Sequence, residues 1–102
     1  MKSFKPYYAV IFVSKKKENI PEYEPMAMAM VKLAKEQPGF LGVDSAQGEI
    51  GLTVSYWKNL EAISNWKQNT EHLVAQQKGR QDWYEWYDVK ICKVEREYNF
   101  NK

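Results

Sequence analysis

The chain of 102 residues carries 15 basic and 13 acidic side chains, so its formal net charge is only +2. This charge is too small for a nucleic-acid footprint, and no apolar run approaches the roughly 20 residues of a membrane span. One cysteine, Cys92, excludes an internal disulfide and a multi-cysteine metal site. We therefore expect a cytoplasmic protein with a buried Cys92, no bound metal, and no nucleic-acid or membrane partner.

The first half of the chain predicts a strand, a helix and a hairpin. Residues 7–14 read YYAVIFVS, which is apolar on both alternating faces and indicates a strand covered on both sides. Apolar residues recur at helical spacing over 23–34, and Pro38 ends that helix. A Pro-Gly turn opens the short strand within 38–46, and residues 52–57 form its returning partner.

The second half predicts a helix followed by one long strand. Asn59 suits the N-cap of the helix, and Thr70 is expected to interrupt it and to cap a second piece that Gly79 ends. Residues 83–98 then alternate apolar and polar side chains as a strand does. The alternation changes phase at residues 91–92, which predicts a β-bulge there.

The predicted order is β-α-β-β-α-β, the order of the ferredoxin-like split βαβ fold. We expect one α+β domain over residues 1–102, with a core of about 7–98 and both helices on one face of an antiparallel sheet. Tyr8, Val10 and Phe12 are expected on the other face, which would be too apolar to remain in water. Aromatic residues make up 15% of the chain, more than a small core readily absorbs. Both features predict a homodimer whose sheets pack together.

Three stretches, QPGFLGVDSA, VSYWKNLEAISNWKQNTEHLVAQQKGR and WYEWYDVKICKVEREY, carry a resemblance to a known family. With the opening strand they span roughly Tyr7 to Tyr98, and the chain resembles the antibiotic biosynthesis monooxygenase (ABM) domain family. The resemblance implies a dimeric α/β barrel. The family includes cofactor-independent oxygenases of aromatic polyketides, quinol oxygenases, haem-degrading enzymes and many small members of unknown role.

The haem-degrading branch implies an asparagine on the first strand, a tryptophan on the second helix and a histidine ligand further along. Trp66 matches the tryptophan, but residues 7–14 contain no asparagine. Gln76 stands near the ligand position, and His72 lies one turn earlier. The resemblance therefore favours the branch that uses no cofactor, and haem binding is the weaker alternative.

Cofactor-independent oxygenation of a small aromatic or quinol-type substrate needs a base, fixed hydrogen-bond donors and a dry pocket that admits dioxygen. His72, the only histidine, is the candidate base, and Trp66 is the candidate catalytic donor. We expect a pocket between the sheet and the helices. The residues expected to bind substrate there are Asn65, Tyr56, Trp83, Tyr84 and Arg80, with Trp57, Trp86 and Tyr87 as further aromatic walls.

Each candidate also has a structural interpretation. Trp66 lies beside the apolar stripe of its helix and could serve packing alone, and His72 could be exposed and inert. Nothing in the chain forms an obvious acid–base pair. A non-catalytic dimer that binds a small ligand, or serves in a stress response, is therefore the alternative function.

Overall fold

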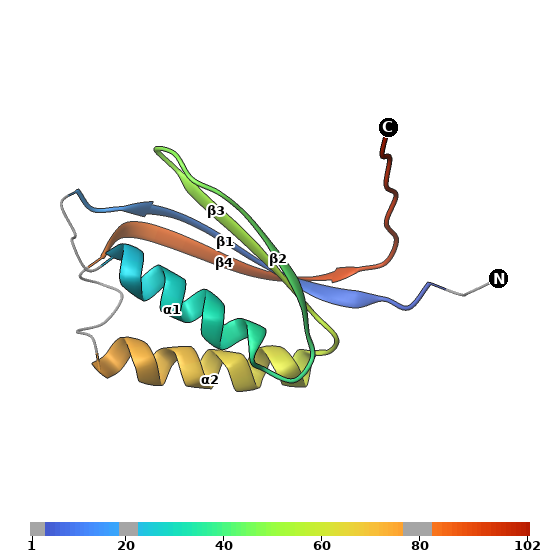
Figure 1. Cartoon of the computed structure of the whole chain (residues 1–102), viewed down its shortest axis with the longest axis horizontal. Coiled ribbons are helices and arrows are strands. Elements are labelled where there is room, and N and C mark those ends of the chain that lie inside the picture. The colour runs from blue at the N-terminus through green and yellow to red at the C-terminus, as the bar shows by residue number, and fades with distance from the viewer. Residues whose placement is uncertain (1–3, 19–22, 77–82) are drawn as a thin grey trace.

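The computed structural model describes residues 4–18, 23–76 and 83–102, and it leaves out the side chains of Tyr23, Met26 and residues 71–76. The predicted order of elements is confirmed, and the fold is α+β and ferredoxin-like (Figure 1). The elements are β1 (Tyr7–Lys16), α1 (Tyr23–Lys35), β2 (Phe40–Ala46), β3 (Gly51–Trp57), α2 (Leu60–Gln76) and β4 (Tyr84–Val94).

The four strands form one antiparallel sheet in the order β2-β3-β1-β4, and α1 and α2 lie side by side beneath one of its faces (Figure 1). We call this face the helix side and the opposite face the outer face. The main helix contacts are those of α1 with β2 and of α2 with β3. The core reaches Val10 of β1, while the helix-side residues Tyr87, Val89 and Ile91 of β4 are exposed, so the helices cover β2, β3 and part of β1 and leave β4 open.

The core lies between the helices and β1–β3. Val10 of β1, Ala34 of α1, Trp57 of β3, and Ala62 and Ile63 of α2 form one buried cluster. Complete burial of a large apolar side chain contributes about 2–3 kcal/mol, so Trp57, which is fully buried, dominates this cluster.

The faces of β1 are the reverse of those expected. Because Val10 belongs to the core and side chains alternate along a strand, Tyr8 and Phe12 share the helix side with it. The outer face instead carries the odd-numbered residues of β1, among them Tyr7, Ala9, Ile11 and Val13. Both sets are apolar, so alternation alone could not distinguish them, and only the position of the helices does so.

Two local predictions for α2 have different outcomes. Asn59 caps the helix as expected, because its Oδ1 accepts the Ala62 N–H at 2.8 Å. The predicted interruption at Thr70 is wrong, since α2 is continuous to Gln76. The Thr70 hydroxyl donates to the Lys67 carbonyl at 2.9 Å, a bond back to the preceding turn that a helix accommodates. Gly79 lies outside the described residues.

The strand β4 also departs from its prediction. It ends at Val94, and its pairing with β1 is regular through residues 91–92, so the bulge expected there is wrong. The irregularity lies at the other end, where Glu85 is the extra residue between the partners of Lys15 and Lys16. Cys92 is exposed rather than buried, because it lies on the outer face, opposite Ala9.

Within the described ranges, no helix combines the length and apolar character that crossing a membrane requires.

The turn between α1 and β2 depends on Gly39. Its φ is 85°, a backbone conformation that residues other than glycine rarely adopt. A Cβ there would lie 2.7 Å from the Cβ of Ala62, so the turn and the first turn of α2 touch through this glycine.

We predict that Gly39→Ala lowers the free energy of unfolding by about 3 kcal/mol, from backbone strain and steric overlap together. Gly48→Ala is the matched control, since its added Cβ would meet nothing nearer than the Ile50 carbonyl at 4.0 Å. Urea titration followed by tryptophan fluorescence measures both variants. Equal stability of the two would contradict the prediction.

Candidate functional site

Trp66 is held against the core by aromatic contacts. Its ring centroid lies 5.1 Å from that of Trp57. Trp57 also forms a T-shaped pair with Phe40, with the two ring centroids 5.4 Å apart. Trp66 lies three residues beyond Ile63 on α2, so both side chains point to the same face of the helix. The indole of Trp66 is therefore rigidly placed between α2 and the sheet.

The two neighbouring indoles differ in their hydrogen bonds. The Nε1–H of Trp57 donates to the Ser55 hydroxyl at 2.9 Å. The Nε1 of Trp66 is buried and has no hydrogen-bond partner among the described residues. Leaving a buried donor unpaired costs about 1–3 kcal/mol. An acceptor oxygen on a bound molecule would recover that cost, which makes this N–H a candidate donor to a ligand.

A second aromatic cluster lies further along the helix side. Phe12 of β1 contacts Tyr84 and Tyr87 of β4, with both centroid distances at 5.5 Å, and the two tyrosine rings are 5.8 Å apart. Val89 and Ile91 follow on the same face of β4 and are 46% and 51% exposed. We call Phe12, Tyr84, Tyr87, Val89 and Ile91 the open face. They are accessible because the helices cover chiefly the other half of the sheet.

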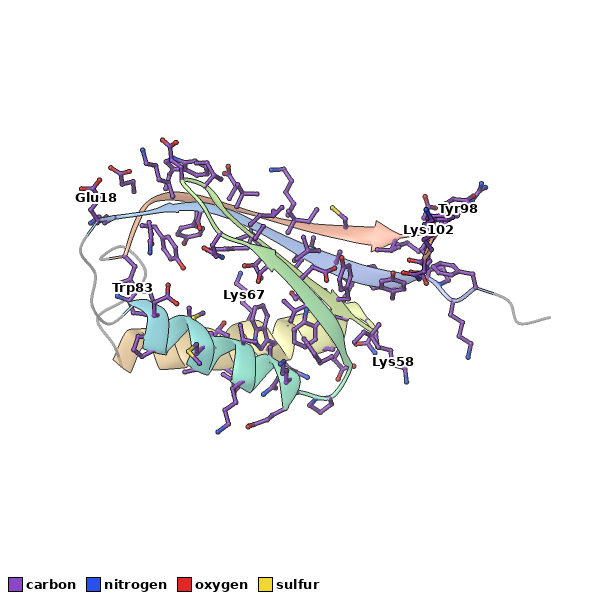
Figure 2. The ribbon with its side chains drawn as sticks, turned by 45° about the horizontal axis from the view of Figure 1, so that its top comes forward. Glu18, Lys58, Lys67, Trp83, Tyr98 and Lys102 are labelled. Carbon is purple, nitrogen blue, oxygen red and sulfur yellow. The ribbon has the colours of Figure 1, made fainter. Side chains whose placement is uncertain are left out.

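Lys67 brings a positive charge to the edge of α2 that borders the open face. Asn69 donates to the Gln37 side chain at 3.0 Å, so that flank of α2 faces the end of α1. Lys67 precedes Asn69 by two residues and lies about 200° from it around the helix, on the flank away from α1. Figure 2 shows the Lys67 side chain rising from α2 beneath the sheet. The arrangement suits an aromatic molecule that carries negative charge.

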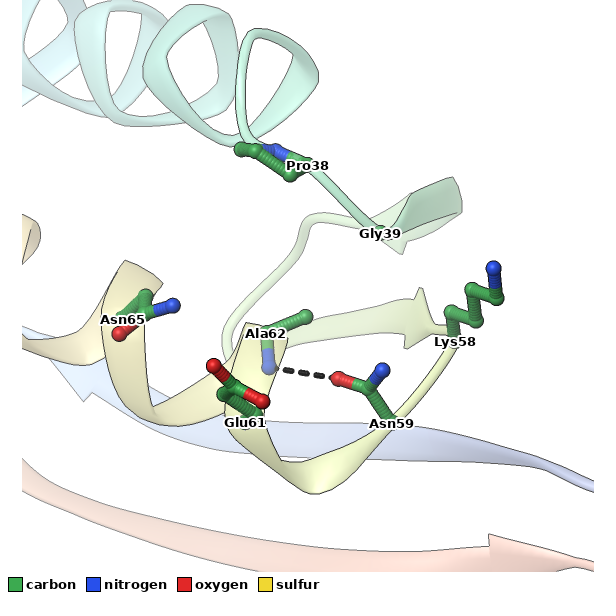
Figure 3. Close-up of a pocket in the computed structure, with 7 residues that line it drawn as sticks. All are labelled: Pro38, Gly39, Lys58, Asn59, Glu61, Ala62 and Asn65. Atoms are coloured by element: carbon green, nitrogen blue, oxygen red, sulfur yellow. Dashed lines mark hydrogen bonds between the residues drawn. The ribbon is translucent and has the colours of Figure 1, made fainter.

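A separate groove lies where the α1–β2 turn meets the start of α2 (Figure 3). Its volume is about 270 Å³. Part of its wall is formed by Asn59 and Ala62, whose N–H donates the capping hydrogen bond to Asn59. Lys58 and Glu61 place opposite charges on its rim. Its lining residues are Pro38, Gly39, Lys58, Asn59, Glu61, Ala62 and Asn65. The groove is polar and faces solvent, and Trp66 is absent from its lining.

The structure separates the predicted site residues. Asn65 lines the polar groove, while Trp66 points into the interior and Tyr84 belongs to the open face. Tyr56 lies on the outer face, where its hydroxyl donates to Asp44 at 2.9 Å, so it cannot line a pocket on the helix side of its own subunit. That bond raises the pKa of Tyr56.

The remaining predicted site residues are Trp83, His72 and Arg80. Trp83 is buried at the start of β4, and its Nε1 also has no hydrogen-bond partner in the described part of the chain. The backbone of His72 belongs to α2, but its side chain lies outside the description, and Arg80 lies outside the described residues altogether.

Sequence reasoning missed Phe12 and Lys67 as site residues. Phe12 lies two residues beyond Val10 on β1, so both side chains are on the same face of the strand. Phe12 would have been predicted if the face of β1 that the helices cover had been known. Lys67 follows Ile63 by one helical turn, so its spacing placed it beside the buried stripe. A charged residue at such a position is usually assigned to solvent, and only the open half of the sheet gives it another environment.

Comparisons with known proteins agree with this architecture. The sequence model of a family described as antibiotic biosynthesis monooxygenase matches residues 6–78. YqjZ of Bacillus subtilis is 52% identical over 100 residues, which cover 95% of this chain and 87% of YqjZ.

Two solved structures share the fold at low sequence identity. SnoaB from Streptomyces nogalater, a cofactor-independent oxygenase, aligns with a TM-score of 0.73 at 10% identity over 89% of this chain and 95% of its own. PA3566 from Pseudomonas aeruginosa aligns with a TM-score of 0.68 at 20% identity, over 95% of this chain and 100% of its own.

We predict that Trp57→Phe destabilises the protein more than Trp66→Phe, by about 1 kcal/mol or more. Both changes remove indole volume. Among the described residues, only the first also breaks a hydrogen bond, and it removes the donor to the Ser55 hydroxyl. Chemical denaturation of the two matched variants measures the difference. A larger loss for Trp66→Phe would contradict the prediction.

Proposed function

The chain belongs to the antibiotic biosynthesis monooxygenase family, and from this premise we propose that it is a cofactor-independent monooxygenase of small aromatic, quinol-type substrates. The observation that carries the proposal is the buried N–H of Trp66, which has no hydrogen-bond partner in the part of the chain that the structure describes. A donor fixed in a dry interior stabilises developing negative charge on oxygen more effectively than water does, because it needs no reorganisation.

The proposed reaction uses electrons from the substrate. A base removes a proton from the aromatic substrate, and the resulting anion transfers an electron to dioxygen. The two radicals combine to a peroxide anion, and the protonated base returns its proton to give a hydroperoxide. The ring carbon then carries one hydrogen and the hydroperoxyl group. Loss of water from it leaves a carbonyl, so one oxygen atom enters the product and the other leaves as water.

Each residue has a role in this proposal. The Trp66 N–H holds the substrate oxygen as it becomes negative, and the charge of Lys67 lowers the pKa of the substrate hydroxyl. The open face supplies aromatic surface for the ring, with Tyr84 and Tyr87 against Phe12. His72 is the proposed base, since its neutral imidazole accepts a proton near pH 7.

A binding function without turnover is the second candidate. Trp66 packs against the apolar core cluster, and its ring contacts that of Trp57. Such a site retains an aromatic ligand and gives it a single hydrogen bond without supplying an acid or a base. This candidate predicts thermal stabilisation by the ligand and no product.

We further propose that the protein is a homodimer that pairs its outer faces. Ala9, Ile11 and Val13 of β1 and Val54 of β3 form a contiguous apolar strip there, while α1 and α2 occupy the opposite face. A two-fold axis would bury the strip of each subunit against its copy.

The purified, cofactor-free protein is expected to consume oxygen with a member of a panel of hydroquinones, anthrones and related phenols. Trp66→Phe should lower the rate about 100-fold, the usual effect of losing one oxyanion donor, and Trp86→Phe on the outer face is the matched control. Full activity of Trp66→Phe would contradict the site. Ligand binding without oxygen uptake across the panel would support the binding function instead.

For the assembly, we expect light scattering at micromolar concentration to give the mass of a dimer. Val54→Asp should yield a folded monomer, because it places a charge in the apolar strip without entering the core. Met28→Asp is the control, since Met28 is exposed on α1. A wild-type protein of monomer mass would refute the assembly.

A further inference from the structure

The segment that follows β4, residues 95–102, extends away from the domain. It leaves the end of the sheet and rises on the side opposite the helices, which is the outer-face side (Figure 1). We call this segment the arm. Tyr98 and Phe100 of the arm are 85% and 86% exposed, more than any other large hydrophobic side chain in the described residues. Two aromatic rings held in water are a strong indication of a binding surface.

The base of the arm is anchored at one end of the outer face. The Tyr7 hydroxyl donates to the Glu97 carboxylate at 2.8 Å, and the ring of Tyr7 also contacts Phe4 and Tyr56. The bond to Glu97 raises the pKa of Tyr7. The anchoring interaction is therefore complete below the ordinary tyrosine pKa and is lost only as the pH rises through the raised value.

The arm is long enough to span the gap between two sheets packed face to face. At about 3.3 Å per extended residue, Tyr98 reaches ~13 Å beyond Val94 and Phe100 reaches ~20 Å. Two sheets packed face to face are separated by only about 10 Å. An arm that rises from one sheet is therefore long enough to reach the outer face of a second copy with both aromatic rings.

The opposite end of the outer face has exposed apolar side chains of its own. Leu52 and Trp86 are 39% and 42% exposed, and they stand opposite Val13 and Lys15 of β1. The base of the arm lies beside Tyr7, eight residues away along β1, or about 27 Å. An arm cannot fold back over Leu52 and Trp86 of its own sheet while it rises away from that sheet.

We propose that the arm of each subunit embraces a second copy of this chain and packs Tyr98 and Phe100 against its Leu52 and Trp86. The proposal rests on the outer-face dimer proposed above. A two-fold axis between the sheets and perpendicular to the strands places the arm end of one subunit over the Trp86 end of the other. An axis parallel to the strands would bring both arms to one end and both copies of Leu52 and Trp86 to the other, out of reach of the arms.

The test is photo-crosslinking of the full chain with p-benzoylphenylalanine in place of Phe100. Irradiation is expected to give a covalent dimer, with crosslinked peptides from the beginning of β3 or β4. Mixing ¹⁵N-labelled and unlabelled protein identifies crosslinks between chains. The same photoreactive residue in place of Met28 on α1 is the control and should give monomer only.

Three results would overturn the proposal. Crosslinks within one chain, or to the Tyr7 end of the second copy, would refute it although a dimer forms. A dimer mass with no crosslink between chains would also refute it and leave the outer-face dimer standing. A monomer mass for the unmodified protein would refute both.

A pair of serine substitutions provides an independent measurement. Tyr98→Ser combined with Phe100→Ser should raise the dimer dissociation constant at least 10-fold, as measured by analytical ultracentrifugation. The unfolding midpoint of the monomer should not change. Trp86→Ala should weaken it similarly, and adding Trp86→Ala to the serine pair should have little further effect because the contact is already lost. Full additivity would show that the arm and Trp86 do not interact.

Discussion

The contact of Trp57 with Phe40 and Trp66 is the interaction on which the rest of the structure depends. It joins the end of β3, the start of β2 and the middle of α2, three segments brought together by turns at Gly39 and Asn59. Only a glycine allows the α1–β2 turn to approach Ala62 closely enough for Phe40 to reach Trp57. The position of Trp66, and with it the candidate site, follows from this packing.

The same packing makes the domain asymmetric. With the helices anchored over β2 and β3, the helix side of β4 remains accessible, and its exposed Val89 and Ile91 continue the aromatic surface of Phe12. An open apolar surface on the same side of the sheet as a buried donor with no partner among the described residues is a disposition suited to binding, and it would be costly as architecture alone. The outer face is a second apolar surface, and the arm, with its exposed Tyr98 and Phe100, rises on that side of the sheet.

Much of the fold, and one residue of the candidate site, could be predicted from the sequence. The order of elements followed from apolar periodicity, and the cap at Asn59 followed from its side chain and its place before an apolar stripe. Trp66 could be singled out because its type and position matched a family pattern. The errors have a common cause. The faces of β1, the bulge and the exposure of Cys92 all depend on which neighbour a residue meets, and Thr70 showed that a helix tolerates a hydroxyl that bonds its preceding turn.

The sequence by itself determined the elements, their order and the family, because these depend on local spacing and on residues adjacent in the chain. The tertiary structure decided which face of each strand is covered, and therefore that Tyr56 and Trp66 lie on opposite sides of the sheet. It also decided that the indole of Trp57 is hydrogen-bonded, while that of Trp66 has no partner among the residues that the structure describes. A strand apolar on both faces carries no record of where the helices pack, since that choice is made by contacts between residues far apart in the chain.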